Sequence, residues 1–85
     1  MKTPIYDALQ AYADRQPIRF HMPGHKGHAA IPAWNPLYAL DITEISGADS
    51  LLEADGIIAE SEQIATALFF SAGTVYSCAG STGCI

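Results

Sequence analysis

The sequence predicts part of an α/β protein, and three observations carry that prediction. Segments 4–15 and 57–69 space their apolar residues as amphipathic helices do. A short β-like stretch, 74–78, follows the second segment and leads into a glycine-rich turn at 80–83. Apolar residues make up 49% of the 85 residues and charged residues only 15%, against about 25% in ordinary soluble domains. So short a chain has a small interior, so we expect additional polypeptide to cover these apolar side chains.

The first predicted helix begins at Thr3-Pro4. A threonine hydroxyl can cap a helix, and proline is tolerated in the first turn because its missing N–H would be unpaired there anyway. Apolar residues then recur at helical spacing from Ile5 to Ala13. Pro17 cannot continue the helix, so we expect it to end shortly before.

Between the helices we expect mostly irregular structure: an extended piece at 18–22, an ordered loop to about residue 36 and a short strand at 41–45. Large apolar side chains in the loop distinguish it from a flexible linker. We divide the chain into residues 1–40, with the first helix and the loop, and 41–85, the start of a larger domain.

The second helix is the stronger prediction, because Ile57, Ile64 and Leu68 share one face and the acidic residues lie elsewhere. Ala72-Gly73 ends or follows it. Thr74 to Cys78 then has the composition of a short strand.

The turn Gly80-Ser81-Thr82-Gly83 has the features of a phosphate-binding turn. Glycine permits a sharp turn and close approach of a ligand, and the two hydroxyls are donors. A helix that follows such a turn adds free N–H groups and its positive dipole end. The alternative is a plain turn, which is the more common role for such a stretch.

The histidine loop, which we define as residues 21–28, is the most unusual stretch (HMPGHKGH). Pro23-Gly24 prevents a helix from aligning its three histidines and no cysteine lies nearby, so we expect no metal site. One hypothesis is a rigid cationic turn beside an active site, with His21, His25 and Lys26 as its polar residues. The other is a solvated loop.

The net charge of −5, with four Lys and Arg residues, argues against nucleic acid and against an anionic membrane surface as partners. No signal peptide or transmembrane span is apparent. The five residues between Cys78 and Cys84 match no zinc or redox motif, so we expect two reduced cysteines in a cytoplasmic protein.

Together these segments resemble the bacterial Orn/Lys/Arg decarboxylases. The resemblance rests on segments 3–9 (TPIYDAL) and 18–27 (IRFHMPGHKG), on 41–45 (DITEI) with Gly47, Asp49 and Leu51, on Gly56-Ile57-Ile58, and on Gly80-Ser81-Thr82-Gly83. It implies the N-terminal fragment of a pyridoxal-phosphate (PLP) enzyme of fold type I, with helix, long ordered loop, helix and short strand. Such enzymes are homodimers or larger and remove the carboxylate of lysine, ornithine or arginine as CO2, leaving the amine.

By the family pattern, Ser81 and Thr82, with Gly80 and Gly83, hold the cofactor phosphate. The lysine that forms the Schiff base lies on a later segment that these 85 residues lack, so no catalytic residue is assigned and the chain is expected to be inactive alone. Asp41, Glu44 and Asp49 could read a basic substrate, although cap or loop roles are favoured for each. Two other functions stay open: a small anion-binding or interaction module, and a non-functional truncated product.

Overall fold

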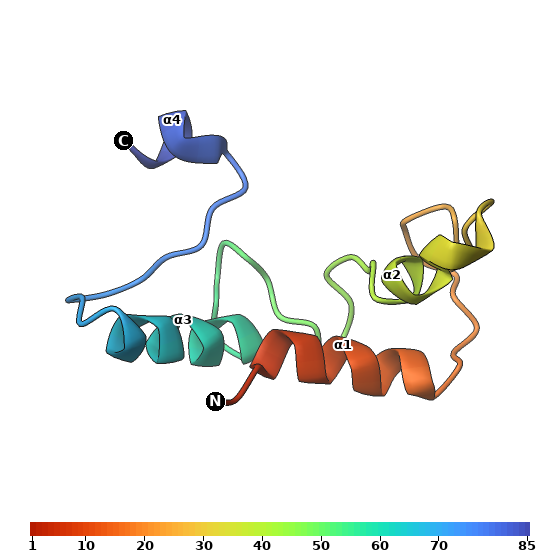
Figure 1. Ribbon diagram of the computed structural model, residues 1–85, viewed down its shortest axis with the longest axis horizontal. Coiled ribbons are helices and arrows are strands. Elements are labelled where there is room, and N and C mark those ends of the chain that lie inside the picture. Colours follow the sequence, from red (N-terminus) through yellow and green to blue (C-terminus); the bar gives the residue numbers. More distant parts are fainter.

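The computed structural model describes all 85 residues as helices joined by long irregular segments (Figure 1). In chain order the elements are α1 (Pro4–Asp14), the 3-10 helix η1 (Pro32–Trp34), α2 (Asn35–Ala39), α3 (Ile57–Leu68) and α4 (Gly80–Cys84). The two long helices, α1 and α3, pack against each other, and η1 leads directly into α2. The α1–α3 contact joins residues 1–40 to residues 41–85.

Helix α1 begins at Pro4, as predicted, but Thr3 does not cap it with its side chain. The Thr3 hydroxyl instead donates to the Asp7 carboxylate, with 2.9 Å between the oxygens. An ionised carboxylate is a strong acceptor, and Asp7 also suits the positive end of the helix dipole. The hydroxyl therefore stabilises the first turn through Asp7.

Helix α3 also forms where it was predicted and ends at Leu68. Ala72-Gly73 follows the helix, and Phe70 is the residue at which the chain turns away from it. Phe70 adopts a left-handed φ of +53°. Its N–H donates to the Ala67 carbonyl and the Ser71 N–H to the Thr66 carbonyl, the hydrogen-bond pattern of a Schellman motif. A phenylalanine occupies the position that glycine usually takes.

The predicted strands at 41–45 and 74–78 and the extended piece at 18–22 form no β-ladder. A strand needs the backbone of a neighbour, and none of these segments pairs with another. Instead, the Tyr76 N–H donates to the Glu62 carboxylate on α3 at 2.8 Å, and Val75 is 83% exposed. Over the 85 residues, the α/β prediction was correct for the two long helices and wrong for the strands.

The chain has no fully buried residue, and its accessible surface is 6357 Å². A compact monomer of this mass would expose about 4,900 Å². The radius of gyration is 14.5 Å, whereas about 12 Å is typical of a compact domain of this length. Many apolar side chains are therefore exposed, as the high apolar content led us to expect. Phe20, Leu52 and Phe70 are among them.

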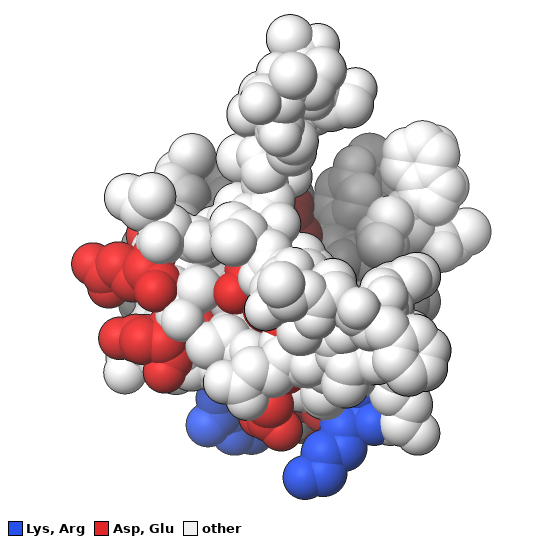
Figure 2. All heavy atoms as spheres, turned by 90° about the vertical axis from the view of Figure 1, so that its left-hand side faces the viewer, with Lys and Arg blue, Asp and Glu red and all other residues white.

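Charge is unevenly distributed, because no charged side chain follows Glu62 in the sequence. On the face shown in Figure 2 the charged side chains gather on the lower part, and the part that projects at the top has none. We call residues 69–85 the terminal segment. None of the helices is long and apolar enough to cross a membrane.

Candidate functional site

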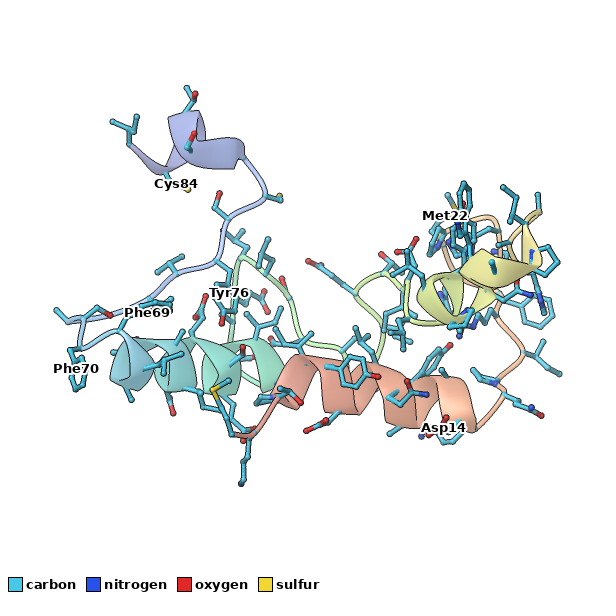
Figure 3. The ribbon with its side chains drawn as sticks, viewed as in Figure 1. Asp14, Met22, Phe69, Phe70, Tyr76 and Cys84 are labelled. Carbon is cyan, nitrogen blue, oxygen red and sulfur yellow. The ribbon has the colours of Figure 1, made fainter.

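The two groups of predicted site residues lie at opposite ends of the molecule. The terminal segment carries the turn at 80–83, close to Cys84 in Figure 3. The histidine loop, marked by Met22, lies near α2 on the side of the molecule where α1 ends at Asp14. The structure therefore does not bring His21, His25 and Lys26 to the turn.

The turn residues form α4 themselves, so the helix includes the turn instead of following it. Gly80 has a left-handed φ of +71°, a conformation that favours glycine. A Cβ on Gly83 would overlap the side chain of Ala79, so the close approach of these two residues also requires glycine. The two glycines give the turn its tight shape.

Ser81 and Thr82 are exposed, and neither hydroxyl has a hydrogen-bond partner within the chain. No side chain caps α4, so the N–H groups of its first turn are also free. Hydroxyls and free amides together are suitable donors for the oxygens of a phosphate group. With only five residues, α4 adds little dipole of its own.

His21 is fixed within the histidine loop through both ring nitrogens. Its Nδ1 lies 2.7 Å from the carbonyl oxygen of Met22, so Nδ1 carries the proton and donates. In the neutral ring Nε2 then accepts from the Tyr12 hydroxyl, 2.5 Å away. The bond to Tyr12 connects the loop to α1.

His25 is fixed in the same way, with the opposite tautomer. The backbone N–H of Gly27 donates to Nδ1 at 2.9 Å, so Nε2 carries the proton and donates to the Asp41 carboxylate at 2.8 Å. The ring also packs on Tyr38, with 4.6 Å between the ring centroids. Both nitrogens of His25 therefore have partners within the chain.

Lys26 has a left-handed φ of +56°, and its Nζ donates to the His21 carbonyl at 2.7 Å. An ammonium has three N–H donors, so two of them stay available to a ligand. Among the three predicted loop residues, Lys26 is the one with free donors. No three His, Cys, Asp or Glu side chains lie close enough to hold a metal ion.

Asp49 has the most perturbed environment in the chain. Its Oδ1 accepts from the N–H groups of Ser50 and Asp55, and its Oδ2 from Gly56 at 2.9 Å and Ile58 at 2.8 Å. Desolvation raises the pKa of this carboxyl, but the backbone hydrogen bonds outweigh it and hold the pKa well below its usual range. Asp49 thus caps α3 from outside the helix, in agreement with the cap role favoured from the sequence.

A family model described as Orn/Lys/Arg decarboxylase, major domain, matches residues 3–85. The chain belongs to this family. Similar curated proteins include the uncharacterized protein YaaO of Bacillus subtilis (36% identical over 87 residues) and the arginine decarboxylases of Bacillus cereus (34% over 90 residues) and Bacillus subtilis (33% over 90 residues). No solved structure matches.

These alignments cover 96% to 99% of the chain but only 18% to 20% of each decarboxylase-family relative. The chain therefore corresponds to about a fifth of the length of these proteins. Within that fifth lie both the histidine loop and the turn at 80–83.

Sequence reasoning missed two residues that organise the loop, Tyr12 and Arg19. Tyr12 lies within the apolar stripe predicted from Ile5 to Ala13, and its hydroxyl also holds His21. Arg19 donates through Nη2 to the Ala39 carbonyl at 2.6 Å and lies over the Tyr12 ring. The signal available for Arg19 was its place among apolar residues, Ile18 and Phe20, where a single cation calls for a specific partner.

Proposed function

We propose that the chain is part of a PLP-dependent decarboxylase that converts a basic amino acid, namely lysine, ornithine or arginine, to the amine and CO2. The observation that carries this proposal is the family match over residues 3–85, together with relatives named arginine decarboxylase. The enzyme we propose is a cytoplasmic homodimer or larger assembly.

In this proposal the turn at 80–83 holds the cofactor phosphate. The free hydroxyls of Ser81 and Thr82 donate to phosphate oxygens, while Gly80 and Gly83 allow the backbone to approach closely. PLP, when bound, supplies the electron sink that makes loss of CO2 from an amino acid feasible. The contribution of this chain is to bind and orient the cofactor.

We further propose that these 85 residues are inactive on their own. Their lysines are Lys2 and Lys26. Lys26 lies in the histidine loop, where its Nζ bonds the His21 carbonyl, at the opposite end of the molecule from the turn. A cofactor whose phosphate is held at 80–83 would be far from this amine.

A chimera tests the proposal. Residues 3–85 replace the matching segment of the Bacillus cereus arginine decarboxylase, and CO2 release is measured with arginine, lysine and ornithine separately. We expect activity with at least one of the three. The double variant Ser81→Ala/Thr82→Val should weaken PLP binding more than about tenfold, because it removes two hydrogen bonds to a charged group.

The control is Ser71→Ala, which removes an exposed hydroxyl that bonds only within its own segment. It should leave PLP affinity unchanged. A well-folded chimera without decarboxylase activity on any of the three amino acids would contradict the proposal. If the double variant and its parent bind PLP equally well, only the role of the turn is contradicted, and the proposed decarboxylase activity is not.

A further inference from the structure

A polar pocket of about 360 Å³ lies between the end of α1 and the histidine loop. Arg19, Lys26 and His28 line it together with Gln16, and no Asp or Glu does. The chain has four Lys and Arg residues and a net charge of −5. Two of those four cations thus face one pocket that lacks carboxylates.

The Arg19 guanidinium is held in place before any ligand arrives. Nη2 donates to the Ala39 carbonyl at 2.6 Å, and Cζ lies 5.1 Å from the centroid of the Tyr12 ring. A Cβ on Gly27 would lie 2.9 Å from Cζ, and Gly27 has a left-handed φ of +83°. Glycine therefore leaves the space that the guanidinium occupies.

No acidic side chain neutralises these cations. The Asp41 carboxylate, which accepts from Nε2 of His25, does not line the pocket. Nη1 of Arg19 is closed off from water and has no hydrogen-bond partner. Lys26 bonds only the His21 carbonyl. A desolvated, unpaired positive charge at the wall of a pocket attracts anions.

We propose that this pocket binds an oxyanion, either a carboxylate or a phosphate group. Exposed Lys26 and His28 supply the direct contacts, and the fixed Arg19 supplies the positive potential and orients the group. The site is separate from the turn at 80–83 and does not depend on the proposed cofactor role.

The alternative role for these cations is to stabilise the C-terminal end of α1. The carbonyl end of α1 lies beside the pocket, and helix C-termini attract positive charge. Arg15 makes a matched control for that role. It is the C-cap residue of α1 and lies over the same Tyr12 ring, at 5.6 Å, but it does not line the pocket.

The test is an NMR titration of the 15N-labelled chain with inorganic phosphate and, separately, with acetate, at constant ionic strength set by chloride. We expect saturable shifts of the Gly27 and His28 amides. Lys26→Gln and Arg19→Gln should each weaken binding about tenfold, since each removes a charged partner. Arg15→Gln should change the affinity less than twofold.

If phosphate alone saturates the shifts, the pocket binds phosphate groups. If phosphate and acetate both saturate them, the pocket accepts carboxylates as well. The proposal is overturned if neither anion shifts the loop amides saturably, or if Arg15→Gln weakens binding as much as Lys26→Gln. Lys26 is exposed, so its variant tests the site even if Arg19→Gln unfolds the loop. Shifts confined to residues 80–83 would support the cofactor turn and overturn this site.

Discussion

The histidine loop and the terminal segment are both rich in glycine and poor in regular structure, but they are held in different ways. Side chains fix the loop: Tyr12 bonds His21, Lys26 bonds the His21 carbonyl, and His25 bonds Asp41. The terminal segment is bonded to α3 through Thr74 and Tyr76. Beyond Tyr76 no bond to another element is found.

The difference follows from the chemistry of the two regions. Polar side chains in the loop find partners on α1 and around Asp41, so a small chain can satisfy them internally. The terminal segment has no charged side chain and exposes Phe69, Phe70, Val75 and Ile85. Apolar side chains gain stability only by burial, and this chain offers no surface to bury them. The polar side chains of the loop thus have partners within the chain, whereas the apolar side chains of the terminal segment stay exposed.

The largest expected effect comes from Asp49→Ala. Asp49 lies between the two regions and, like the loop side chains, holds the backbone through hydrogen bonds. This change leaves the N–H groups of Gly56 and Ile58 without their acceptor and should unwind the first turn of α3. We expect hydrogen-exchange protection of the α3 amides to fall more than about tenfold. Asp55→Ala is the control, because its side chain makes no such bond, and protection should persist in it.

Asp49 also predicts a pH dependence. Its pKa is lower in the folded chain than its ordinary value, so the cap contributes its full stability above that ordinary value. The contribution is lost as the pH falls through the lowered folded pKa. Helix content followed by circular dichroism should therefore hold as the pH passes 3.8, the ordinary value, and fall only in stronger acid. Loss of α3 already at weakly acidic pH would contradict the assignment.

The second effect is smaller and tests the loop itself. Tyr12→Phe keeps the aromatic ring over which Arg19 lies but removes the hydroxyl that bonds His21. One hydrogen bond is worth about 1 kcal/mol, so protection of the loop amides should fall about fivefold. Tyr6→Phe, which removes a longer exposed bond of 3.4 Å to Gln10, should change it little. Equal effects would show that the bond to His21 does not order the loop.

Residue patterns predicted the parts of the fold whose interactions are local. The apolar stripes of α1 and α3 and the proline that starts α1 give correct helix starts, because spacing along one helix is visible in the sequence. The bonds of His21 to Tyr12 and of His25 to Asp41 join residues nine and sixteen positions apart. No local pattern specifies such pairs, so the site's internal contacts could not be predicted.

The strand at 74–78 failed for a different reason. Its residues have β-propensity, but propensity describes how side chains fit a pleated, partly buried surface. With no neighbouring strand, the backbone bonds a side chain, Glu62, in place of a ladder.

The smallest expected effect tests this explanation directly. Val75 was predicted at the centre of the strand and is 83% exposed. Val75→Thr should therefore change the stability of the 85-residue chain by less than about 0.5 kcal/mol, as surface substitutions do. Ile18→Thr is the matched control, because Ile18 lies just before the histidine loop and is 84% exposed. It should change the stability equally little.

In the chimera with the Bacillus cereus enzyme the two substitutions should separate. If the terminal segment becomes a buried strand there, Val75→Thr places a hydroxyl in an apolar interior and costs about 1–3 kcal/mol, measured by chemical denaturation. A large cost already in the isolated chain would mean that Val75 is buried without additional polypeptide. A negligible cost in both proteins would mean that the segment never joins a sheet. Either result would remove the contrast between the locally ordered loop and a terminal segment that depends on its surroundings.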